Sequence, residues 1–178
     1  MSTAAVATAT GKVDEARIAF EALYRDSRDD VFAYVAGLLR DRSAAEEVTS
    51  QAFERAWRKR RQINRRRGTP RAWVFGIARN AALDELRRRS RLAPEPADEL
   101  GPEPAPSTDP AEAAVDRTLL REALDSLSGR ELELVALKFF AGLSNAEIAS
   151  VIHTSESNAG TRVHRVIEKL RRSIDEAE

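Results

Sequence analysis

A cluster of polar and basic side chains lies near the C-terminus, on a segment whose apolar residues repeat at helical spacing. Its outward-facing members near the start of the segment are Ser157, Asn158, Gly160, Thr161, His164 and Arg165. Serine, threonine, asparagine and arginine side chains can hydrogen-bond base edges or phosphates. This segment, over about residues 156–172, follows a shorter apolar one over about residues 145–152 after a very short break. The spacing is typical of a helix-turn-helix, whose second helix enters the major groove of DNA, although an ordinary helical hairpin shares it.

A second concentration of basic side chains lies over residues 55–91, where 14 basic and 2 acidic residues occur. Residues 92–116 carry 7 acidic and no basic side chains, and the net charge of the whole chain is zero. Because field strength depends on local charge, the basic stretch indicates a polyanion partner, with a solvated helix face as the alternative. Trp57, Trp73 and Phe75 accompany the arginines and could stack on unpaired bases, although Trp57 and Phe75 fit a hydrophobic core better.

The sequence offers no catalytic or metal-binding constellation. Cysteine is absent, which excludes a disulfide framework, a thiolate zinc site and a cysteine nucleophile, and two histidines are too few for a histidine-rich metal centre. The adjacent pairs Glu46–Glu47 and Asp84–Glu85 point in different directions on a helix and build no two-carboxylate site. No glycine-rich phosphate-binding loop occurs. We therefore expect neither enzymatic activity nor a bound metal or cofactor.

The elements that must position these side chains are helices. Apolar residues recur at helical spacing in three stripes, which are Val31, Tyr34, Val35, Leu38 and Leu39; Leu132, Val135, Ala136 and Phe139; and Val163, Val166, Ile167, Leu170 and Ile174. Helix starts are signalled by three capping-box pairs, Ser43 with Glu46, Ser128 with Glu131 and Ser144 with Glu147, and by Thr69 before Pro70. No convincing alternating strand pattern occurs, so the sequence predicts an all-α fold.

A proline-rich acidic segment divides the chain into two parts. It contains six of the seven prolines, which are Pro94, Pro96, Pro102, Pro104, Pro106 and Pro110. Because proline disfavours helix, we expect a disordered tail over residues 1–15, a helical domain over 16–91, a linker over 92–116 and a second helical domain over 117–178. The start lacks the features of a signal peptide, and no run approaches the roughly 18 apolar residues of a membrane span. We therefore expect a cytoplasmic protein.

Three segments together resemble a known family. The segment AWVFGIARNAALDELRRRSR, Ala72–Arg91, is similar to the pattern Trp-Leu-x-x-Ile-Ala-x-Asn-x-x-x-Asp-x-x-Arg of bacterial RNA polymerase sigma factors of the sigma-70 family, extracytoplasmic-function (ECF) group. DRSAAEEVTSQAFERAW, Asp41–Trp57, resembles their polymerase-binding segment. LSNAEIASVIHTSESNAGTRVHRVIEKLR, Leu143–Arg171, resembles the helix-turn-helix that reads the −35 element. Phe20–Arg91 thus resembles sigma region 2, and Leu119–Ser173 resembles region 4.

The resemblance implies a promoter-specificity subunit whose partners are core RNA polymerase and promoter DNA. The residues implied for binding the clamp helices of the polymerase β′ subunit are Glu46, Glu47, Gln51 and Phe53. Those implied for the melted −10 element are Asn64, Arg65, Arg66, Arg67, Trp73, Asn80, Asp84, Arg87, Arg88 and Arg91. Those implied for the −35 element are Ser157, Asn158, Thr161, Arg162, His164 and Arg165. Contact with the β flap and control by an anti-sigma factor are further family expectations.

The chain departs from the family pattern at several positions. Glu47 replaces the usual aspartate, Ser50–Gln51 replaces a Gln-Glu pair, and Gly160 stands where many relatives place a basic residue. The acidic linker either mimics a nucleic acid within the polymerase or serves only as a spacer. Two other functions stay open: a helix-turn-helix regulator that binds duplex DNA without polymerase, and a protein-interaction module that such factors regulate or that mimics them.

Overall fold

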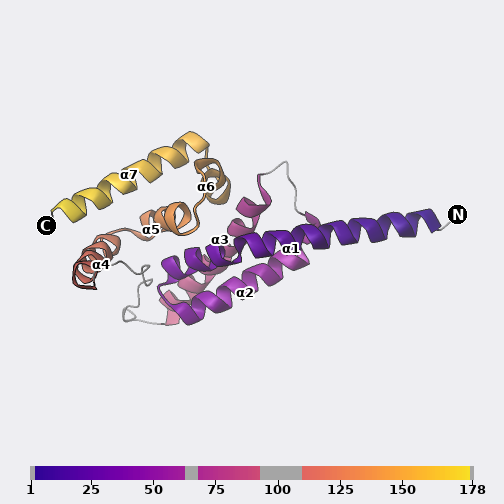
Figure 1. Ribbon diagram of the computed structural model, residues 1–178, viewed down its shortest axis with the longest axis horizontal. Coiled ribbons are helices and arrows are strands. Elements are labelled where there is room, and N and C mark those ends of the chain that lie inside the picture. The colour runs from indigo at the N-terminus through magenta and orange to yellow at the C-terminus, as the bar shows by residue number, and fades with distance from the viewer. Residues whose placement is uncertain (1–2, 63–67, 93–109, 177–178) are drawn as a thin grey trace.

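The computed structural model describes residues 3–62, 68–92 and 110–176 of the chain (Figure 1). Its elements are α1 (Thr3–Leu39), α2 (Arg42–Arg58), the 3-10 turn η1 (Arg60–Gln62), α3 (Pro70–Leu92), α4 (Pro110–Asp125), α5 (Gly129–Val135), the π-helical turn η3 (Ala136–Phe140), α6 (Asn145–Ile152) and α7 (Glu156–Asp175). Every regular element within these ranges is helical, which confirms the all-α fold. No helix within them combines the length and apolar character that a membrane span requires.

Helices α1, α2 and α3 form an N-terminal bundle. Arg40, with a φ of 51°, reverses the chain between α1 and α2, so that the two helices lie side by side (Figure 1). Asp41 caps α2, because its carboxylate accepts the backbone N–H of Ala44 at 3.0 Å. The capping box expected from Ser43 and Glu46 is wrong, since Asp41 starts the helix two residues earlier and leaves Ser43 inside its first turn.

Helix α3 begins as the sequence predicts. Thr69 precedes Pro70, and the Thr69 hydroxyl accepts the backbone N–H of Ala72 at 3.0 Å. Proline suits the first helical position because its missing N–H would have no partner there. The buried face of α3 packs against both α1 and α2, with Phe75 fully buried against Tyr34 of α1 at a ring-centroid distance of 5.7 Å. The expected core position of Phe75 is confirmed.

Two helix starts differ from the expected boundaries. α1 begins at Thr3, within the segment expected as a disordered tail, and the alanines near its start favour helix strongly. α4 begins at Pro110, inside the expected linker 92–116, again with proline at the first helical position. Residues 93–109, the remainder of that linker apart from Leu92, lie outside the described residues.

Helices α4 to α7, with η3, form a C-terminal bundle. Ser128 and Ser144 both complete the capping boxes that the sequence predicts, so α5 and α6 begin where expected. His153, in the left-handed region with a φ of 56°, ends α6, and Ser155 caps α7 three residues after α6 ends. This short connection between two helices confirms the helix-turn-helix.

The apolar stripe through η3 differs from the expected one. Phe139 was expected on the buried face, but its side chain is 57% exposed, whereas Phe140 packs against the core. A π-helical turn holds one residue more than an α-helical turn, which rotates the following side chains around the axis. The rotation turns Phe140 toward α1 of the N-terminal bundle.

The two bundles share one continuous apolar core. The C-terminal bundle gathers at the end of α1 away from the N-terminus (Figure 1), with α6 against α3 and η3 against α1. Buried side chains of both bundles, such as Val35, Phe75, Leu137 and Ile148, belong to a single cluster. The sequence predicts two helical domains, and the structure adds their direct contact.

Candidate nucleic-acid and partner interfaces

The start of α7 presents a polar, solvent-facing surface. All six side chains predicted to face DNA there are exposed: Ser157, Asn158, Thr161, Arg162, His164 and Arg165. Asn158 Nδ2 donates to Thr154 Oγ1 at 2.8 Å, and the Thr161 hydroxyl donates to the Ser157 carbonyl at 2.9 Å. These two bonds fix the polar side chains, while Arg162 and Arg165 have no ion-pair partner among the described residues. The arginines are therefore free to meet phosphates.

Gly160 on the same helix has a packing role that sequence reasoning missed. A Cβ atom built on Gly160 would lie 3.1 Å from Nδ2 of Asn145, the first residue of α6. Such a separation is tighter than ordinary van der Waals contact, so glycine lets the two helices of the helix-turn-helix cross closely. The pairwise crossing of helices leaves no local sequence signal.

Helix α3 carries the second set of predicted DNA-facing residues. Asn80, Asp84, Arg87, Arg88 and Arg91 are exposed, and Trp73 is partly buried. The other predicted members, Asn64, Arg65, Arg66 and Arg67, lie outside the described residues. Unlike Arg162 and Arg165 of α7, Arg87 and Arg88 of α3 have carboxylate neighbours. Arg87 lies 2.9 Å from Asp84, and Arg88 makes two bonds of 2.7 Å to Glu85.

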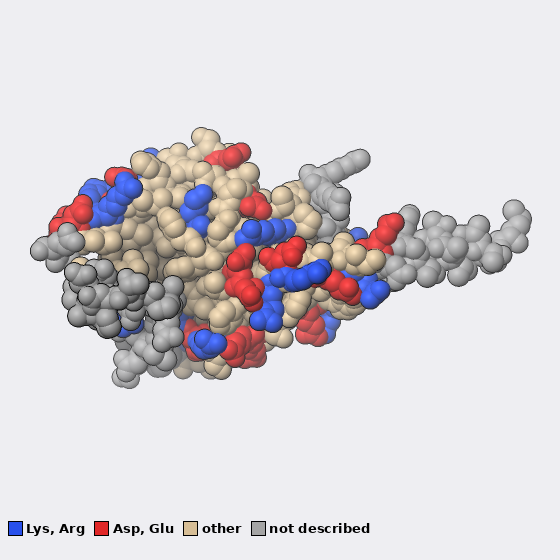
Figure 2. Space-filling view, viewed as in Figure 1, with Lys and Arg blue, Asp and Glu red and all other residues tan. Residues whose placement is uncertain are grey.

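Glu85 is the centre of a small charge network on α3. Hydrogen bonds from Arg88 and then Arg89 lower its pKa to about 2, although burial opposes the shift. Arg89 also binds Asp41 at 2.7 Å, which ties α3 to the first turn of α2. The charge count of residues 55–91 therefore overstates the free positive charge of this helix. Figure 2 likewise shows basic and acidic side chains interspersed over the middle of the molecule.

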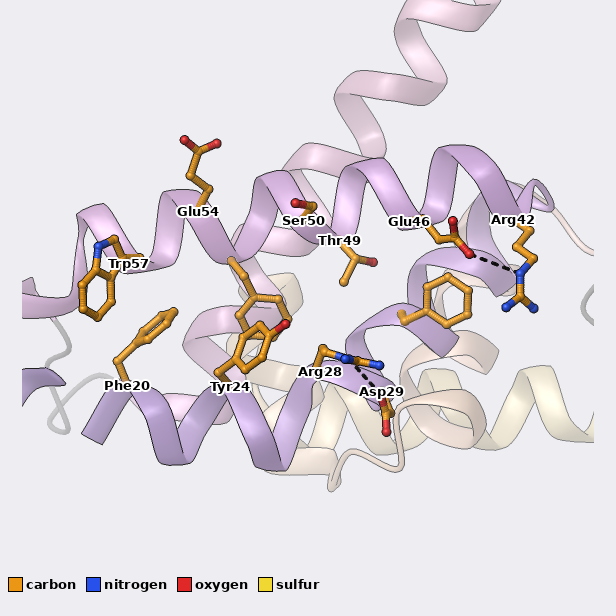
Figure 3. A pocket seen from close by; sticks show the side chains of 12 residues that line it. Phe20, Tyr24, Arg28, Asp29, Arg42, Glu46, Thr49, Ser50, Glu54 and Trp57 are labelled. Atoms are coloured by element: carbon orange, nitrogen blue, oxygen red, sulfur yellow. Dashed lines mark hydrogen bonds and ion pairs between the residues drawn. The ribbon is translucent and has the colours of Figure 1, made fainter. Parts of the chain in front are cut away.

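A groove of about 620 Å³ lies between α1 and α2 (Figure 3). Two edge-to-face aromatic pairs cross it, Phe20 with Trp57 at 5.1 Å and Tyr24 with Phe53 at 4.8 Å between ring centroids. Trp57, expected in the core, is 36% exposed at one end of the groove, where the guanidinium of Arg60 lies 3.8 Å from its ring centroid. The two aromatic pairs give the groove an apolar surface, which suits the apolar face of a partner helix.

The polar residues of the groove are arranged around its rim and floor. Arg28 pairs with Asp29 at 3.1 Å, and Arg42 pairs with Glu46 at 3.2 Å, both along the rim (Figure 3). The Thr49 hydroxyl on the groove wall is buried and has no hydrogen-bond partner among the described residues. A buried hydroxyl without a partner costs free energy, which an incoming hydrogen-bonding group would recover.

The structure divides the four predicted polymerase-binding residues between the groove and its flank. Glu46 and Phe53 line the groove, whereas Glu47 and Gln51 pair with each other at 3.1 Å beside it. The α1 wall, with Phe20 and the residues facing α2, was missed, because helix pairing cannot be read from one stretch of sequence. No group of three or more histidine or acidic side chains in the described ranges suits a metal ion.

Comparisons with known proteins identify both bundles. The family model for sigma-70 region 2 matches residues 23–92, and that for sigma-70 region 4 matches residues 117–170. The ECF RNA polymerase sigma factor SigL of Mycobacterium tuberculosis is 31% identical over 156 residues, which cover 87% of this chain and 88% of that protein. The ECF RNA polymerase sigma factor SigK of Mycobacterium ulcerans is 28% identical, covering 89% of this chain and 87% of its own length.

Two solved structures share the fold. The sigma factor RpoE of Bartonella quintana, in complex with the anti-sigma factor NepR, matches with a TM-score of 0.69 and 20% identity over 88% of this chain and 96% of that one. CnrH in complex with the cytosolic domain of CnrY matches with a TM-score of 0.66 and 20% identity, over 94% and 96% of the two chains. At this identity the likeness concerns the fold alone.

Proposed function

Because the chain belongs to the extracytoplasmic-function group of the sigma-70 family, we propose that its two bundles divide promoter recognition as the family resemblance implies. It is an alternative sigma factor: sigma region 2 and region 4 domains bind core RNA polymerase and promoter DNA and act in transcription initiation. Sigma factors are in general DNA-recognition subunits and not enzymes. We infer the same for this chain, acting in the cytoplasm beside the polymerase.

In this proposal the C-terminal bundle binds the −35 element. The exposed start of α7 enters the major groove, as the second helix of a helix-turn-helix does. Arg162 and Arg165 bind backbone phosphates beside the major groove, since both are exposed and neither has a carboxylate partner among the described residues. Ser157, Asn158, Thr161 and His164 then face base edges, where hydroxyl and amide groups can donate or accept hydrogen bonds.

In the same proposal, the N-terminal bundle binds the −10 element and the polymerase. Asn80 and the exposed arginines of α3, with residues 64–67, hold the melted strand, and Trp73 offers an aromatic face on which a base can stack. The groove between α1 and α2 receives an apolar helix face of the polymerase β′ clamp helices, and the C-terminal bundle contacts the β flap. The two aromatic pairs, together with a Thr49 hydroxyl that has no hydrogen-bond partner in the described part of the chain, support a helix as the occupant.

Run-off transcription with purified core polymerase tests the function as a whole. Genomic DNA, core polymerase and this chain should give transcripts that start at discrete sites, because only a sigma factor directs the polymerase. A helix-turn-helix regulator would bind duplex DNA but leave the polymerase without start sites. That alternative is not favoured, since it does not account for the match of residues 23–92 to sigma-70 region 2.

Charge reversal on α2 tests the polymerase-binding surface separately. The variant Glu46→Lys/Glu47→Lys should bind core polymerase at least tenfold more weakly while keeping its helical circular dichroism, because both side chains are exposed. Glu122→Lys on exposed α4 is the matched control and should bind normally. Normal affinity of the double variant would move the docking surface away from this end of α2.

An anti-sigma factor is a further proposed partner. The sigma factor RpoE of Bartonella quintana, which shares this fold, was solved in complex with the anti-sigma factor NepR. We infer that a protein of this class also holds the present chain inactive. Co-purification of the tagged chain from its own cells, followed by loss of run-off transcripts on adding the captured protein, would support this inference, and unchanged transcripts would contradict it.

A further inference from the structure

The middle of the groove between α1 and α2 is polar, whereas one of its ends is aromatic (Figure 3). Arg28 and Asp29 of α1 lie there across the groove from Thr49 and Ser50 of α2, and we call these four residues the polar notch. We propose that the polar notch binds a carboxylate carried by the docked helix, and that this contact selects the partner. The inference rests on the proposed function of the groove as a helix-binding site.

Thr49 is the residue of the polar notch that points to a ligand. It is only 7% exposed, and its hydroxyl has no hydrogen-bond partner among the described residues. A threonine inside a helix can bond its hydroxyl to the carbonyl of the preceding turn, and Thr49 does not make this bond. A buried hydroxyl without a partner destabilises the free chain, so a partner atom that arrives with the docked helix gives the group a purpose.

The polar notch continues a regular series of side chains along both walls of the groove. Side chains four residues apart line each wall, namely Phe20, Tyr24 and Arg28 on α1 and Trp57, Phe53 and Thr49 on α2. Four residues advance about 6 Å along a helix axis, which is roughly one turn. The two aromatic pairs and the polar notch therefore follow one another at intervals of about one turn (Figure 3).

This spacing defines what the docked helix must carry. A helix lying along the groove meets the two aromatic pairs with two apolar side chains about one turn apart. It then meets the polar notch with a side chain a further turn along, on the same face. The inferred partner is an amphipathic helix whose apolar face ends in an acidic residue.

Arg28 supplies the positive charge that holds the carboxylate. Its Nε lies 3.1 Å from Asp29 Oδ1, but the two side chains are 59% and 87% exposed. Water competes for an ion pair this exposed, so little is lost when Arg28 turns toward a second carboxylate. A guanidinium carries five N–H donors, and its bond to a carboxylate strengthens once a docked helix excludes water.

The other charges of the groove favour an acidic ligand over a basic or neutral one. Glu46 pairs with Arg42, and Glu54 pairs with Arg58, so neither carboxylate is left to hold a cation. A neutral amide would satisfy the Thr49 hydroxyl but leave the Arg28 guanidinium covered without an added opposite charge. A carboxylate satisfies both groups, because it accepts from the hydroxyl and the guanidinium together.

Docking moves one side chain of the groove in this proposal. The Thr49 hydroxyl oxygen is enclosed in the free chain, so the carboxylate reaches it only when a neighbouring side chain shifts. The aromatic pairs are packed edge to face at 4.8 and 5.1 Å between centroids and hold their places. Arg28 is long, flexible and more than half exposed, so it is the side chain that moves.

Substitutions of Thr49 test the hydroxyl directly. Thr49→Val keeps the shape of the side chain, and its affinity for purified core polymerase should fall about tenfold, as for a lost hydrogen bond to a charged group. Its urea midpoint should not fall, because no hydrogen bond of the free chain is removed. Thr49→Ser keeps a hydroxyl and should recover most of the affinity. The matched control is Ser27→Ala, which removes a buried hydroxyl outside the groove and should bind normally.

Three results with the Thr49 variants would overturn the proposal. Unchanged affinity of Thr49→Val would show that the hydroxyl meets no ligand. An equal loss in Thr49→Ser would assign the effect to packing of the methyl group. A lower urea midpoint in Thr49→Val would show that the hydroxyl is already bonded within the free chain.

The charge of the polar notch is tested by Arg28→Gln. This variant should bind core polymerase about tenfold more weakly, whereas Arg25→Gln, at an exposed position of α1 outside the groove, should bind as wild type does. The double variant Thr49→Val/Arg28→Gln should lose less than the product of the two single losses, because both groups bind one carboxylate. A loss equal to the full product would mean that the two residues meet different ligands.

Variants of the polymerase identify the carboxylate itself. Core polymerase is reconstituted with β′ subunits in which the acidic residues of the clamp helices are replaced one at a time by the matching amides. One replacement should weaken binding of the wild-type chain but leave binding of Thr49→Val/Arg28→Gln unchanged. That residue should lie about one turn beyond an apolar side chain of the same helix face. Equal losses for both chains at every position would overturn the proposal.

Failure of this inference is distinguishable from failure of the proposed function. Run-off transcription by wild type together with unchanged binding by Thr49→Val and Arg28→Gln would overturn the polar notch alone. Absence of core binding by the wild-type chain would overturn the proposed function and the role of the polar notch with it.

Discussion

Helices α3 and α7 both carry arginines predicted to meet DNA, but they hold them differently. On α7, Arg162 and Arg165 are exposed without an ion-pair partner among the described residues. On α3, Arg87 and Arg88 have carboxylate partners within 3 Å on their own helix, and Arg79 is held by the other bundle. Binding by α7 therefore adds contacts, whereas binding by α3 exchanges a carboxylate for a phosphate. The comparison shows that a count of basic residues measures binding capacity only where no acidic neighbour competes.

The largest expected effect concerns the free arginines of α7. Arg162→Ala/Arg165→Ala should weaken duplex binding about tenfold per arginine, since a hydrogen bond to a charged group contributes on the order of 1.5 kcal/mol. The slope of log affinity against log salt concentration should become shallower by about 1.8 for two lost phosphate contacts. Fluorescence anisotropy with a 30-base-pair duplex over a salt series measures both quantities.

The matched deletion on α3 removes a pair and leaves the net charge unchanged. Asp84→Ala/Arg87→Ala should alter single-strand affinity by less than threefold, because an exposed ion pair contributes about 0–1 kcal/mol and the net field is preserved. A loss as large as that of the α7 variant would contradict the comparison. It would show that Arg87 leaves Asp84 and binds DNA as freely as Arg162 and Arg165 of α7 do.

A smaller effect is expected on the pH dependence of folding. Glu85 on α3 and Glu131 at the start of α5 both have a pKa of about 2, against an ordinary value of 4.5. The largest cause is the hydrogen bond from Arg88 for Glu85 and the backbone N–H of Ser128 for Glu131. A depressed folded-state pKa stabilises the fold fully above pH 4.5, and this contribution is lost as the pH falls toward 2.

Neutral variants separate the two carboxylates. Glu85→Gln and Glu131→Gln should each lower the free energy of unfolding at pH 7 by about 1 kcal/mol and flatten its decline below pH 4.5. Urea denaturation at pH 7 and pH 3 measures this. The pKa of Glu85, followed by NMR, should rise when DNA draws Arg88 away, whereas that of Glu131 should not move. A constant pKa for Glu85 in the complex would mean that Arg88 never exchanges its partner.

Local hydrogen bonding explains which parts of the fold the sequence predicts. The capping boxes of Ser128 and Ser144 lie within four residues each and are confirmed, as is the helix-turn-helix that follows. Asp41 and Ser43 are both good caps two residues apart, so the sequence alone could not choose between them. The π-helical turn changed which phenylalanine packs against the core, because one inserted residue shifts a whole apolar stripe.

Contacts between distant segments were beyond sequence reasoning. Arg79 and Glu133 lie 54 positions apart in the sequence. The residues next to each of them do not distinguish it from an ordinary charged residue on the surface. The groove could not be predicted either, because the pairing of Phe20 with Trp57 depends on α1 lying beside α2. The predicted DNA-facing residues of α7 are exposed as a group because they share one helix face, whereas those of residues 64–67 stay a prediction outside the described residues.

The smallest expected effect contrasts the interior glycines of the two DNA-facing helices. Gly76 of α3 has no atom within 4 Å of a built Cβ, so Gly76→Ala should gain about 1 kcal/mol from helix propensity alone. Gly160→Ala on α7 gains the same helix propensity, but its new Cβ atom presses against the Asn145 side chain. The side-chain oxygen of Asn145 accepts a 3.4 Å hydrogen bond from Lys138. That bond is weak, so Asn145 can move by a few tenths of an ångström, and Gly160→Ala should stay within about 0.5 kcal/mol of wild type. Urea denaturation with an unchanged m-value measures both variants. Equal stabilisation by the two substitutions would show that α6 and α7 cross more loosely than the 3.1 Å approach indicates, and that Gly160 is not required by packing.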